Sequence, residues 1–175
     1  MKASDDGRGK TKNKLSIHCE HNLVHIIQGD TLMATFNPYL NFAGNTEQAF
    51  EFYKSVFGGE FSNLTRFKDT PEGAKLSPKE REKIMHVSLP IGNGTVLMAT
   101  DALESMGHKL TTGNNFNISV ETDSKEEAKR IYDRLSAGGK IEQPLQDTFW
   151  GAHFGMFADK YGTRWMISYT YPKQK

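Results

Sequence analysis

The stretch from residue 38 to residue 59 reads PYLNFAGNTEQAFEFYKSVFGG and holds a short apolar segment followed by a longer amphipathic one. Between them stands Asn45, a good N-cap residue, with Gln48 placed as in a capping box. Apolar residues then recur at helical spacing. Gly58-Gly59 ends the pattern, because glycine tolerates the left-handed conformation after a helix. We therefore predict a strand followed by a helix.

The second half of the chain repeats this plan. A strand is expected over 116–120, Ser124 and Glu127 form another capping box, and Gly138-Gly139 ends the second helix. Further strands are expected at 60–67, 84–90 and 95–101 in the first half, and at 140–143, 153–158 and 164–170 in the second. Each half thus reads strand–helix–strand–strand–strand, and the duplication predicts an eight-stranded α+β fold.

Composition narrows the classes of function. The chain has 22 Lys and Arg against 21 Asp and Glu, so no basic surface for nucleic acid is expected. No apolar stretch is long enough to span a bilayer and no secretory leader is visible, which predicts a cytoplasmic protein without a membrane partner. Cys19 is the only cysteine, so no disulfide or Cys-based site is expected in the main domain.

The first 32 residues differ from the rest. They begin with a polar, basic run typical of disorder, and we interpret residues 1–32 as an extension, a cloning remnant or a mis-assigned start. The domain is expected over 33–175, with modules at about 36–103 and 114–171. Four residues of the extension are competent metal ligands, but their spacing matches no structural zinc site: His18, Cys19, His21 and His25.

Three segments together resemble a known family. They are PYLNFAGNTEQAFEFYKSVFGG, IMHVSLPIGNGTVLMATD and PLQDTFWGAHFGMFADKYGTRWMISY, and they cover most of residues 36–171. Their amino-acid sequences resemble those of the PhnB-like members of the vicinal-oxygen-chelate (glyoxalase/bleomycin-resistance/dihydroxybiphenyl dioxygenase) superfamily. The resemblance implies two βαβββ modules forming a curved eight-stranded mixed sheet with a cavity, a cup that holds a small ligand, and a homodimer.

Strand alternation predicts which side chains line this cup. Leu97 and Ala99 suit the helix-facing side of their strand, which turns Met98 the other way. In the strand over 116–120, the apolar set Phe116, Ile118 and Val120 is expected to be buried. Applied to the other strands, the same reasoning gives the expected lining: Tyr39, Asn41, Ser88, Met98, Thr100, Asn115, Asn117, Met166 and Ser168.

The family resemblance implies where a metal ion would bind. Enzymatic members hold a divalent ion through His and Glu side chains on the first and last strands of both modules. The matching positions here are Met98, Asn115, Met166 and either Asn37 or Tyr39. Thioethers and amides do not form a competent divalent site, so we expect no metal and no cofactor. The lining suits a neutral or weakly polar organic molecule, in particular an aromatic one, or else ordered water.

Two histidines are candidates for acid–base chemistry. His86 is expected to face the cup with Ser88, and His153 follows the aromatic pair Phe149-Trp150. Trp150 either closes over a ligand or fills a gap at a module or dimer boundary. The alternative interpretation has His86 hydrogen-bonded within a polar sheet face. The charged insertion 68–83 is either a lid or, as is more common, a solvated loop or short helix.

Three functions fit these observations. The first is binding of a small organic molecule in a metal-free cup. The second is a glyoxalase-type lyase, isomerase or dioxygenase that uses His86 or His153 in a non-standard site. The third is a structural or regulatory homodimer with a vestigial cavity. A methyltransferase is not supported, because no Gly-rich turn between a strand and a helix would hold S-adenosylmethionine.

Overall fold

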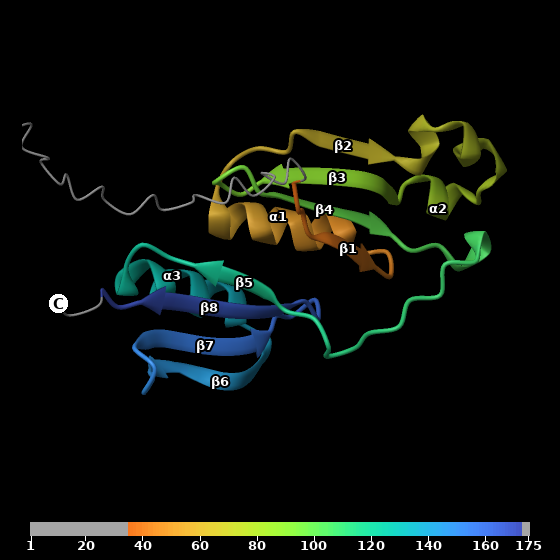
Figure 1. Cartoon of the computed structure of the whole chain (residues 1–175). Helices are drawn as coiled ribbons and strands as arrows, with labels where there is room; N and C mark the ends of the chain where they lie inside the picture. Colours follow the sequence, from red (N-terminus) through yellow and green to blue (C-terminus); the bar gives the residue numbers. More distant parts are fainter. Residues whose placement is uncertain (1–34, 173–175) are drawn as a thin grey trace, which may run out of the picture. The chain divides into compact units, whose positions relative to one another are not determined.

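A computed structural model describes residues 35–172 and contains both modules (Figure 1). The first module consists of β1 (Tyr39–Phe42), α1 (Thr46–Phe57), β2 (Asn63–Arg66), β3 (Ile84–Pro90) and β4 (Val96–Asp101). The second consists of β5 (Ile118–Glu121), α3 (Lys125–Ser136), β6 (Lys140–Asp147), β7 (Ala152–Ala158) and β8 (Arg164–Thr170). The predicted α+β fold with two βαβββ modules is confirmed. Its eight strands divide between two four-stranded sheets, ordered β1-β4-β3-β2 and β5-β8-β7-β6.

Both sheets are mixed in the same way. The first strand of each module runs parallel to the last, as β1 does to β4 and β5 to β8. The helix that follows the first strand returns the chain to the same end of the sheet, and the antiparallel strands after it bring the last strand back to the starting direction. The remaining neighbours are antiparallel. Strands β1 and β5 consequently lie at the edges of their sheets.

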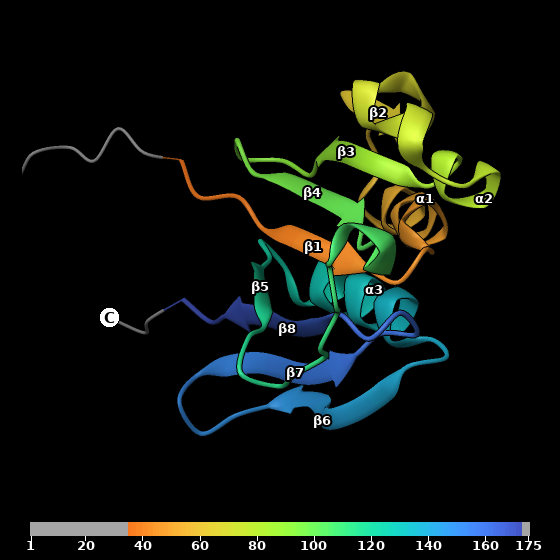
Figure 2. The ribbon, with the colours of Figure 1, turned by 90° about the vertical axis from the view of Figure 1, so that its right-hand side faces the viewer.

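The two helices share one apolar core with both sheets (Figure 2). Leu97 and Ala99 on β4 have no solvent exposure, and neither do Trp165 and Ile167 on β8, so the predicted alternation of these strands is confirmed. Burying a large apolar side chain stabilises the fold by about 1.5–3 kcal/mol. Because the helix-covered faces of both sheets contribute to this single core, the opposite faces turn away from it.

A buried carboxylate joins the two modules. Asp159, in the turn between β7 and β8, is 4% exposed. It accepts hydrogen bonds from the Tyr53 hydroxyl at 2.8 Å and the Trp165 indole at 2.9 Å, and from the backbone amides of Tyr161 and Thr163 at 2.8 and 3.0 Å. A buried charge is tolerated when its oxygens are satisfied in this way. Helix α1 of the first module is thereby bonded to a turn of the second.

The start of α1 is capped by a distant residue, Asp101. Asn45 occupies the N-cap position, but its side chain makes no capping hydrogen bond to the described residues, so the predicted capping box with Gln48 is wrong. Asp101 at the end of β4 accepts hydrogen bonds from the Thr46 amide at 3.1 Å and the Thr46 hydroxyl at 2.7 Å. Its other oxygen accepts one from the Ile84 amide at 2.8 Å. The carboxylate therefore fastens the helix to two strands.

The second helix begins with the predicted Ser124 cap, but among the described residues the Glu127 side chain makes no return hydrogen bond to Ser124, and several strand ends differ. The Ser124 hydroxyl accepts a hydrogen bond from the Glu127 amide at 3.1 Å. Strand β2 is shorter than expected and β6 is longer. Strand β5 starts only at Ile118, and Phe116 is 62% exposed, so its assignment to the buried set was wrong. The apolar run extends beyond the strand, because the pairing of β5 with β8 begins only at Ile118 and Trp165.

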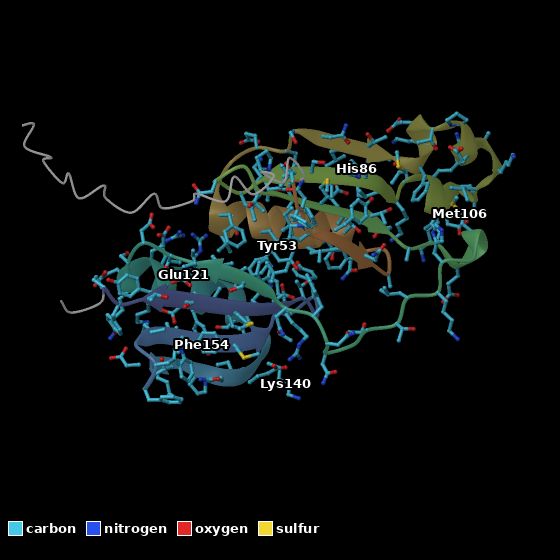
Figure 3. The ribbon with its side chains drawn as sticks, viewed as in Figure 1. Tyr53, His86, Met106, Glu121, Lys140 and Phe154 are labelled. Atoms are coloured by element: carbon cyan, nitrogen blue, oxygen red, sulfur yellow. The ribbon has the colours of Figure 1, made fainter. Side chains whose placement is uncertain are left out.

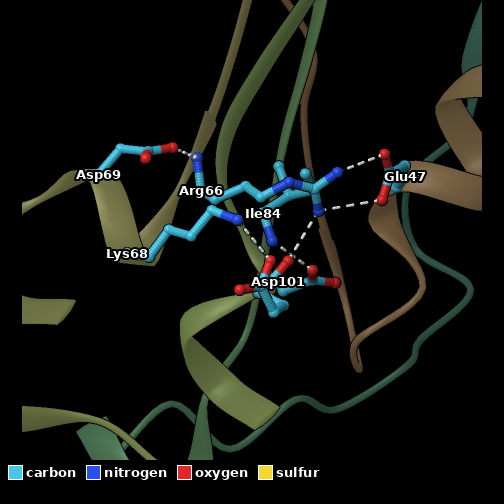
Figure 4. Close-up of polar contacts among 7 residues, drawn as sticks. Glu47, Arg66, Lys68, Asp69, Ile84 and Asp101 are labelled. Carbon is cyan, nitrogen blue, oxygen red and sulfur yellow. Dashed lines mark hydrogen bonds and ion pairs between the residues drawn. The ribbon is translucent and has the colours of Figure 1, made fainter. Parts of the chain in front are cut away.

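The charged insertion forms short helices, one of the predicted alternatives. It contains η1 (Phe67–Asp69), η2 (Pro71–Lys75) and α2 (Pro78–Arg81). Arg66 anchors it by pairing with both oxygens of Glu47 at 3.1 and 2.6 Å, and its backbone amide donates to Asp69 (Figure 4). A lid role stays a prediction.

Several expectations concern residues that the structure does not describe. The boundary at residue 32 and the residues His18, Cys19, His21 and His25 lie outside the described part of the chain. Within residues 35–172, every helix is too short or too polar to cross a bilayer.

Candidate functional site

Most of the predicted lining residues fall into two groups on different sheets. The open face of the first sheet, the side without a helix, carries Tyr39, Asn41, His86, Ser88, Met98 and Thr100. The open face of the second sheet carries Ser119, Phe154, Met156, Met166 and Ser168. Figure 3 shows His86 and Phe154, one from each group, on their separate sheets. Because the shared core lies behind both faces, the expectation of one cup between the two sheets of a single chain was wrong.

On the first open face, cross-strand pairing places polar residues around Met98. Met98 on β4 is paired with Tyr39 on one side and with Ser88 on the other. The next position along β4, Thr100, pairs with Asn41. Tyr39 is 46% exposed and Ser88 only 7%, so the face is open at its β1 edge and covered toward β3.

His86 connects two of these residues through hydrogen bonds. Its Nδ1 atom lies 3.2 Å from the Tyr39 hydroxyl, and its Nε2 atom lies 2.8 Å from the Ser88 hydroxyl. The Tyr39 and His86 rings are also stacked, with centroids 5.7 Å apart. Burial raises the pKa of the Tyr39 phenol, and a hydrogen bond with Thr100 opposes that rise. The three residues form one hydrogen-bonded chain that can hold or pass a proton.

The second open face is apolar in its centre. Met156 on β7 and Met166 on β8 are directly paired, and Ser119 on β5 pairs with Met166 from the other side. Phe154 is paired with Ser168 one step along the sheet. Phe154 and Met156 were not predicted as site residues. The alternation of β7 contained the signal, since Gly155 and Phe157 face the core and turn their neighbours outward.

Trp150 extends this apolar face at one end. Its ring lies 5.9 Å from that of Phe154 and 4.9 Å from that of Phe149, both edge to face. Phe149 is 97% exposed and Trp150 is 55% exposed. The loop is a tight turn, closed by a 2.8 Å hydrogen bond from the Thr148 amide to the Ala152 carbonyl. A rigid turn that presents two aromatic rings is suited to contact a ligand or another protein surface.

His153 lies on the opposite side of the second sheet. It shares its strand face with Gly155, which packs against α3, and it is 9% exposed. Its Nδ1 atom lies 2.5 Å from Asp147, which also accepts hydrogen bonds from Lys125 and Tyr171. The structure therefore does not bring His153 together with His86. Its placement argues against the catalytic role considered for it, because it is committed to an ion-paired cluster away from the open face.

Two of the three predicted asparagines, Asn115 and Asn117, lie apart from the open faces. Asn115 precedes β5 and lines a groove of about 400 Å³ together with Asn41, Leu110 and Arg164. Asn117 lines another groove, of about 500 Å³, beside β5. Among residues 35–172, the buried Oδ1 atom of Asn117 accepts no hydrogen bond. Neither groove is lined by His86, Met98 or Met166.

The strand register identifies the four positions at which a family-type metal would bind. Tyr39 is paired with Met98 and Ser119 with Met166, so Ser119 takes the place predicted for Asn115. Asn37 is excluded, since its side chain accepts a hydrogen bond from the Val96 amide at 2.9 Å. A phenol, a hydroxyl and two thioethers do not fit a divalent cation, which prefers imidazole or carboxylate ligands. Among the described residues, no three His, Cys, Asp or Glu side chains are grouped as a metal ion requires.

Comparison with known families matches this architecture. The model of the Glyoxalase/Bleomycin resistance protein/Dioxygenase superfamily matches residues 35–167. The chain belongs to this superfamily.

Individual proteins are similar to this chain over most of their length. Protein YjdN of Escherichia coli is 35% identical over 140 residues, which cover 75% of this chain and 92% of YjdN. The crystal structure of PA1353 from Pseudomonas aeruginosa is 35% identical, with a TM-score of 0.70, over 78% of this chain and 98% of PA1353. The PhnB protein from Bacillus cereus is 25% identical, with a TM-score of 0.64, over 78% of this chain and all (100%) of that protein. The protein is thus a PhnB-like member.

Proposed function

We propose that this protein binds a small, mostly uncharged aromatic molecule, without a metal ion, in a site that two copies of the chain build together. The observation that carries this proposal is the contrast between the two open faces. One presents the apolar surface of Met156, Met166 and Phe154, and the other presents the hydroxyls and imidazole of Tyr39, His86 and Ser88. Ligand sites combine such an apolar surface with a few placed polar groups.

The second copy is needed because the two faces turn away from one shared core. A ligand on either face of a single chain would remain open to water on its other side. In a two-fold dimer, the first face of one copy can meet the second face of its partner, and both pairs of faces are then used equally. The half-buried methionines and the exposed Phe149 and Trp150 would lose water contact in this arrangement.

The donor set at the four family metal positions supports binding without a metal. Met98 and Met166 are flexible and polarisable, so they adapt to flat aromatic surfaces and gain from contact of sulfur with a ring. Any ligand that stacks on them would be held mainly by apolar contact and oriented by hydroxyl groups.

Thermal denaturation with a panel of small aromatics tests the binding proposal. We expect several compounds, such as 4-nitroanisole and indole, to raise the melting temperature in a saturable manner. Met166→Lys places a charge on the apolar face and should abolish the shift. Met106→Lys, at a residue that is 39% exposed in η3 (Glu104–Met106), is the matched control and should retain it. A flat response of the wild-type protein across the panel would contradict ligand binding and favour a structural or regulatory dimer.

Light scattering after size-exclusion chromatography tests the assembly. We expect a dimer whose dissociation on dilution is promoted by Trp150→Ala. A chain that remains monomeric at every concentration, with or without ligand, would contradict the shared site. Equimolar Ni²⁺ or Zn²⁺ in the purified protein, together with turnover of a methylglyoxal–glutathione hemithioacetal, would instead support the glyoxalase-type enzyme.

A further inference from the structure

We propose that the chain Tyr39–His86–Ser88 is a proton relay that takes a proton from an acidic hydroxyl of the bound molecule, which makes phenols and enols its preferred ligands. This inference rests on the proposed binding function. Its geometry is the contact of both imidazole nitrogens with hydroxyl groups, at 3.2 Å for Tyr39 and 2.8 Å for Ser88. His86 is paired with Thr65 on β2, and its ring is held by the two hydrogen bonds and by the stacked Tyr39 ring.

The number of protons shared by Tyr39, His86 and Ser88 limits the ways in which these three residues can hydrogen-bond. A neutral imidazole has one N–H donor and one bare nitrogen acceptor. If the Tyr39 hydroxyl donates to Nδ1, then Nε2–H donates to Ser88, and the Ser88 proton is left free. If Ser88 donates to Nε2, then Nδ1–H donates to Tyr39, and the Tyr39 proton is left free. The relay therefore always has one end that donates and one end that accepts.

Only the Tyr39 end is accessible to a ligand. Tyr39 is 46% exposed at the edge strand β1, whereas Ser88 is 7% exposed. The apolar side chain beside this end is that of Met98, which pairs directly with Tyr39. A ring seated on Met98 would place its hydroxyl near the Tyr39 oxygen. The phenol thus stands between the ligand and the imidazole.

Proton transfer through the relay conserves the number of protons and the total charge. The O–H bond of the ligand breaks and its proton bonds to the Tyr39 oxygen, while the Tyr39 proton moves to Nδ1 of His86. The imidazole becomes a cation whose Nε2–H donates to Ser88, and the ligand becomes an oxyanion that accepts a hydrogen bond from Tyr39. No electron pair leaves the system and no co-reactant is required. Such positioned proton transfer is the basis of general acid–base catalysis.

The contrast with His153 supports assigning this role to His86 alone. His153 is already engaged at 2.5 Å by the carboxylate of Asp147, which carries the negative charge that would stabilise an imidazolium there. The partners of His86 are neutral hydroxyls, so the negative charge that pairs with its imidazolium is the ligand's own.

A pair of nitroaromatic probes distinguishes the relay from simple binding. 4-Nitrophenol has an acidic hydroxyl and a yellow phenolate, whereas 4-nitroanisole has the same ring without a transferable proton. At a pH where free 4-nitrophenol is mostly protonated, we expect the wild-type protein to generate the phenolate absorption in proportion to bound probe. 4-Nitroanisole should bind without this change. Tyr39→Phe and His86→Gln should remove the phenolate signal and weaken 4-nitrophenol binding about tenfold, the value of one charge-assisted hydrogen bond.

Controls keep the outcomes separate. His108→Gln, at an exposed linker histidine, should leave both probes unaffected. Tyr39→Phe changes a half-exposed position, so it remains informative if His86→Gln fails to fold. Equal affinity for both probes, with no phenolate signal in the wild type, would overturn the relay and leave the binding function standing. Failure of both probes and of the wider aromatic panel would overturn the two proposals together.

Discussion

The Tyr53 hydroxyl donates a 2.8 Å hydrogen bond to the buried carboxylate of Asp159 and so connects α1 of the first module to the β7–β8 turn of the second. Burial, followed by the negative charge of Asp159, raises the pKa of the Tyr53 phenol well above its usual range, so the hydroxyl stays protonated at any ordinary pH. The contact is polar but lies inside the apolar core, where the centroids of the Tyr53 and Trp165 rings are 5.5 Å apart.

Tyr53→Phe should therefore destabilise the protein without opening a cavity. The carboxylate loses one donor, and hydrogen bonds to charged groups contribute about 1.5–3 kcal/mol to the free energy of unfolding. Urea denaturation measures the loss. Tyr132→Phe is the control, since its hydroxyl makes only a 3.3 Å hydrogen bond to the Gln143 carbonyl and should cost less. Equal losses for the two variants would contradict a special role for Asp159.

Asp101 should matter more to α1 than its adjacent N-cap residue. Asp101→Ala removes three hydrogen bonds, two to Thr46 and one to Ile84, and leaves buried donors without partners. We expect a loss of about 2–4 kcal/mol in unfolding free energy, by summing the cost of a lost cap and of unsatisfied donors. Asn45→Ala should change stability by only about 0.5 kcal/mol, because its side chain makes no cap. A reversed order in a denaturant titration would show that the assignment is wrong.

The cluster around Asp147 should make part of the stability depend on pH. Hydrogen bonds from Lys125 first, and then from Tyr171 and His153, hold the pKa of the Asp147 carboxyl well below its usual range. A carboxyl with a lowered folded pKa stabilises the fold fully above its unfolded pKa of about 3.9 and loses this contribution as the pH falls through the folded value. Asp147→Asn should lower the melting temperature near neutral pH, with a gap that narrows in strong acid. A gap of constant size across the pH range would refute this.

Trp150→Ala should reduce ligand binding more than stability. Trp150 is 55% exposed, so little core packing is lost, but its edge-to-face contact with Phe154 shapes one end of the second open face. Aromatic contacts of this kind contribute about 0.5–1.5 kcal/mol, which corresponds to a two- to tenfold weaker binding of 4-nitroanisole. Calorimetric titration measures this change. Phe116→Ala, at an aromatic residue that is 62% exposed and lies off both open faces, should bind the probe normally.

Much of the fold could be predicted because its elements depend on local patterns. The alternation around Met98 and Met166 placed these residues on the open faces, and the Ser124 cap is a local hydrogen bond. The site was predicted less completely. Phe154 and Met156 were missed although β7 alternates clearly, and Asn115 was assigned to a strand that begins three residues later, at Ile118.

The amino-acid sequence by itself determined the two βαβββ modules, the helix-facing sides of β4 and β8, and the thioether side chains Met98 and Met166 at two of the family metal positions. These properties follow from the period of apolar residues and from the residue types present. Only the tertiary structure decided that both helix-covered faces share one core, that Asp101 and Asp159 are bound by donors from distant segments, and that Tyr39, His86 and Ser88 form a chain while His153 lies elsewhere. Contacts between residues far apart in the chain depend on how the sheets pack, and local periodicity carries no information about that packing.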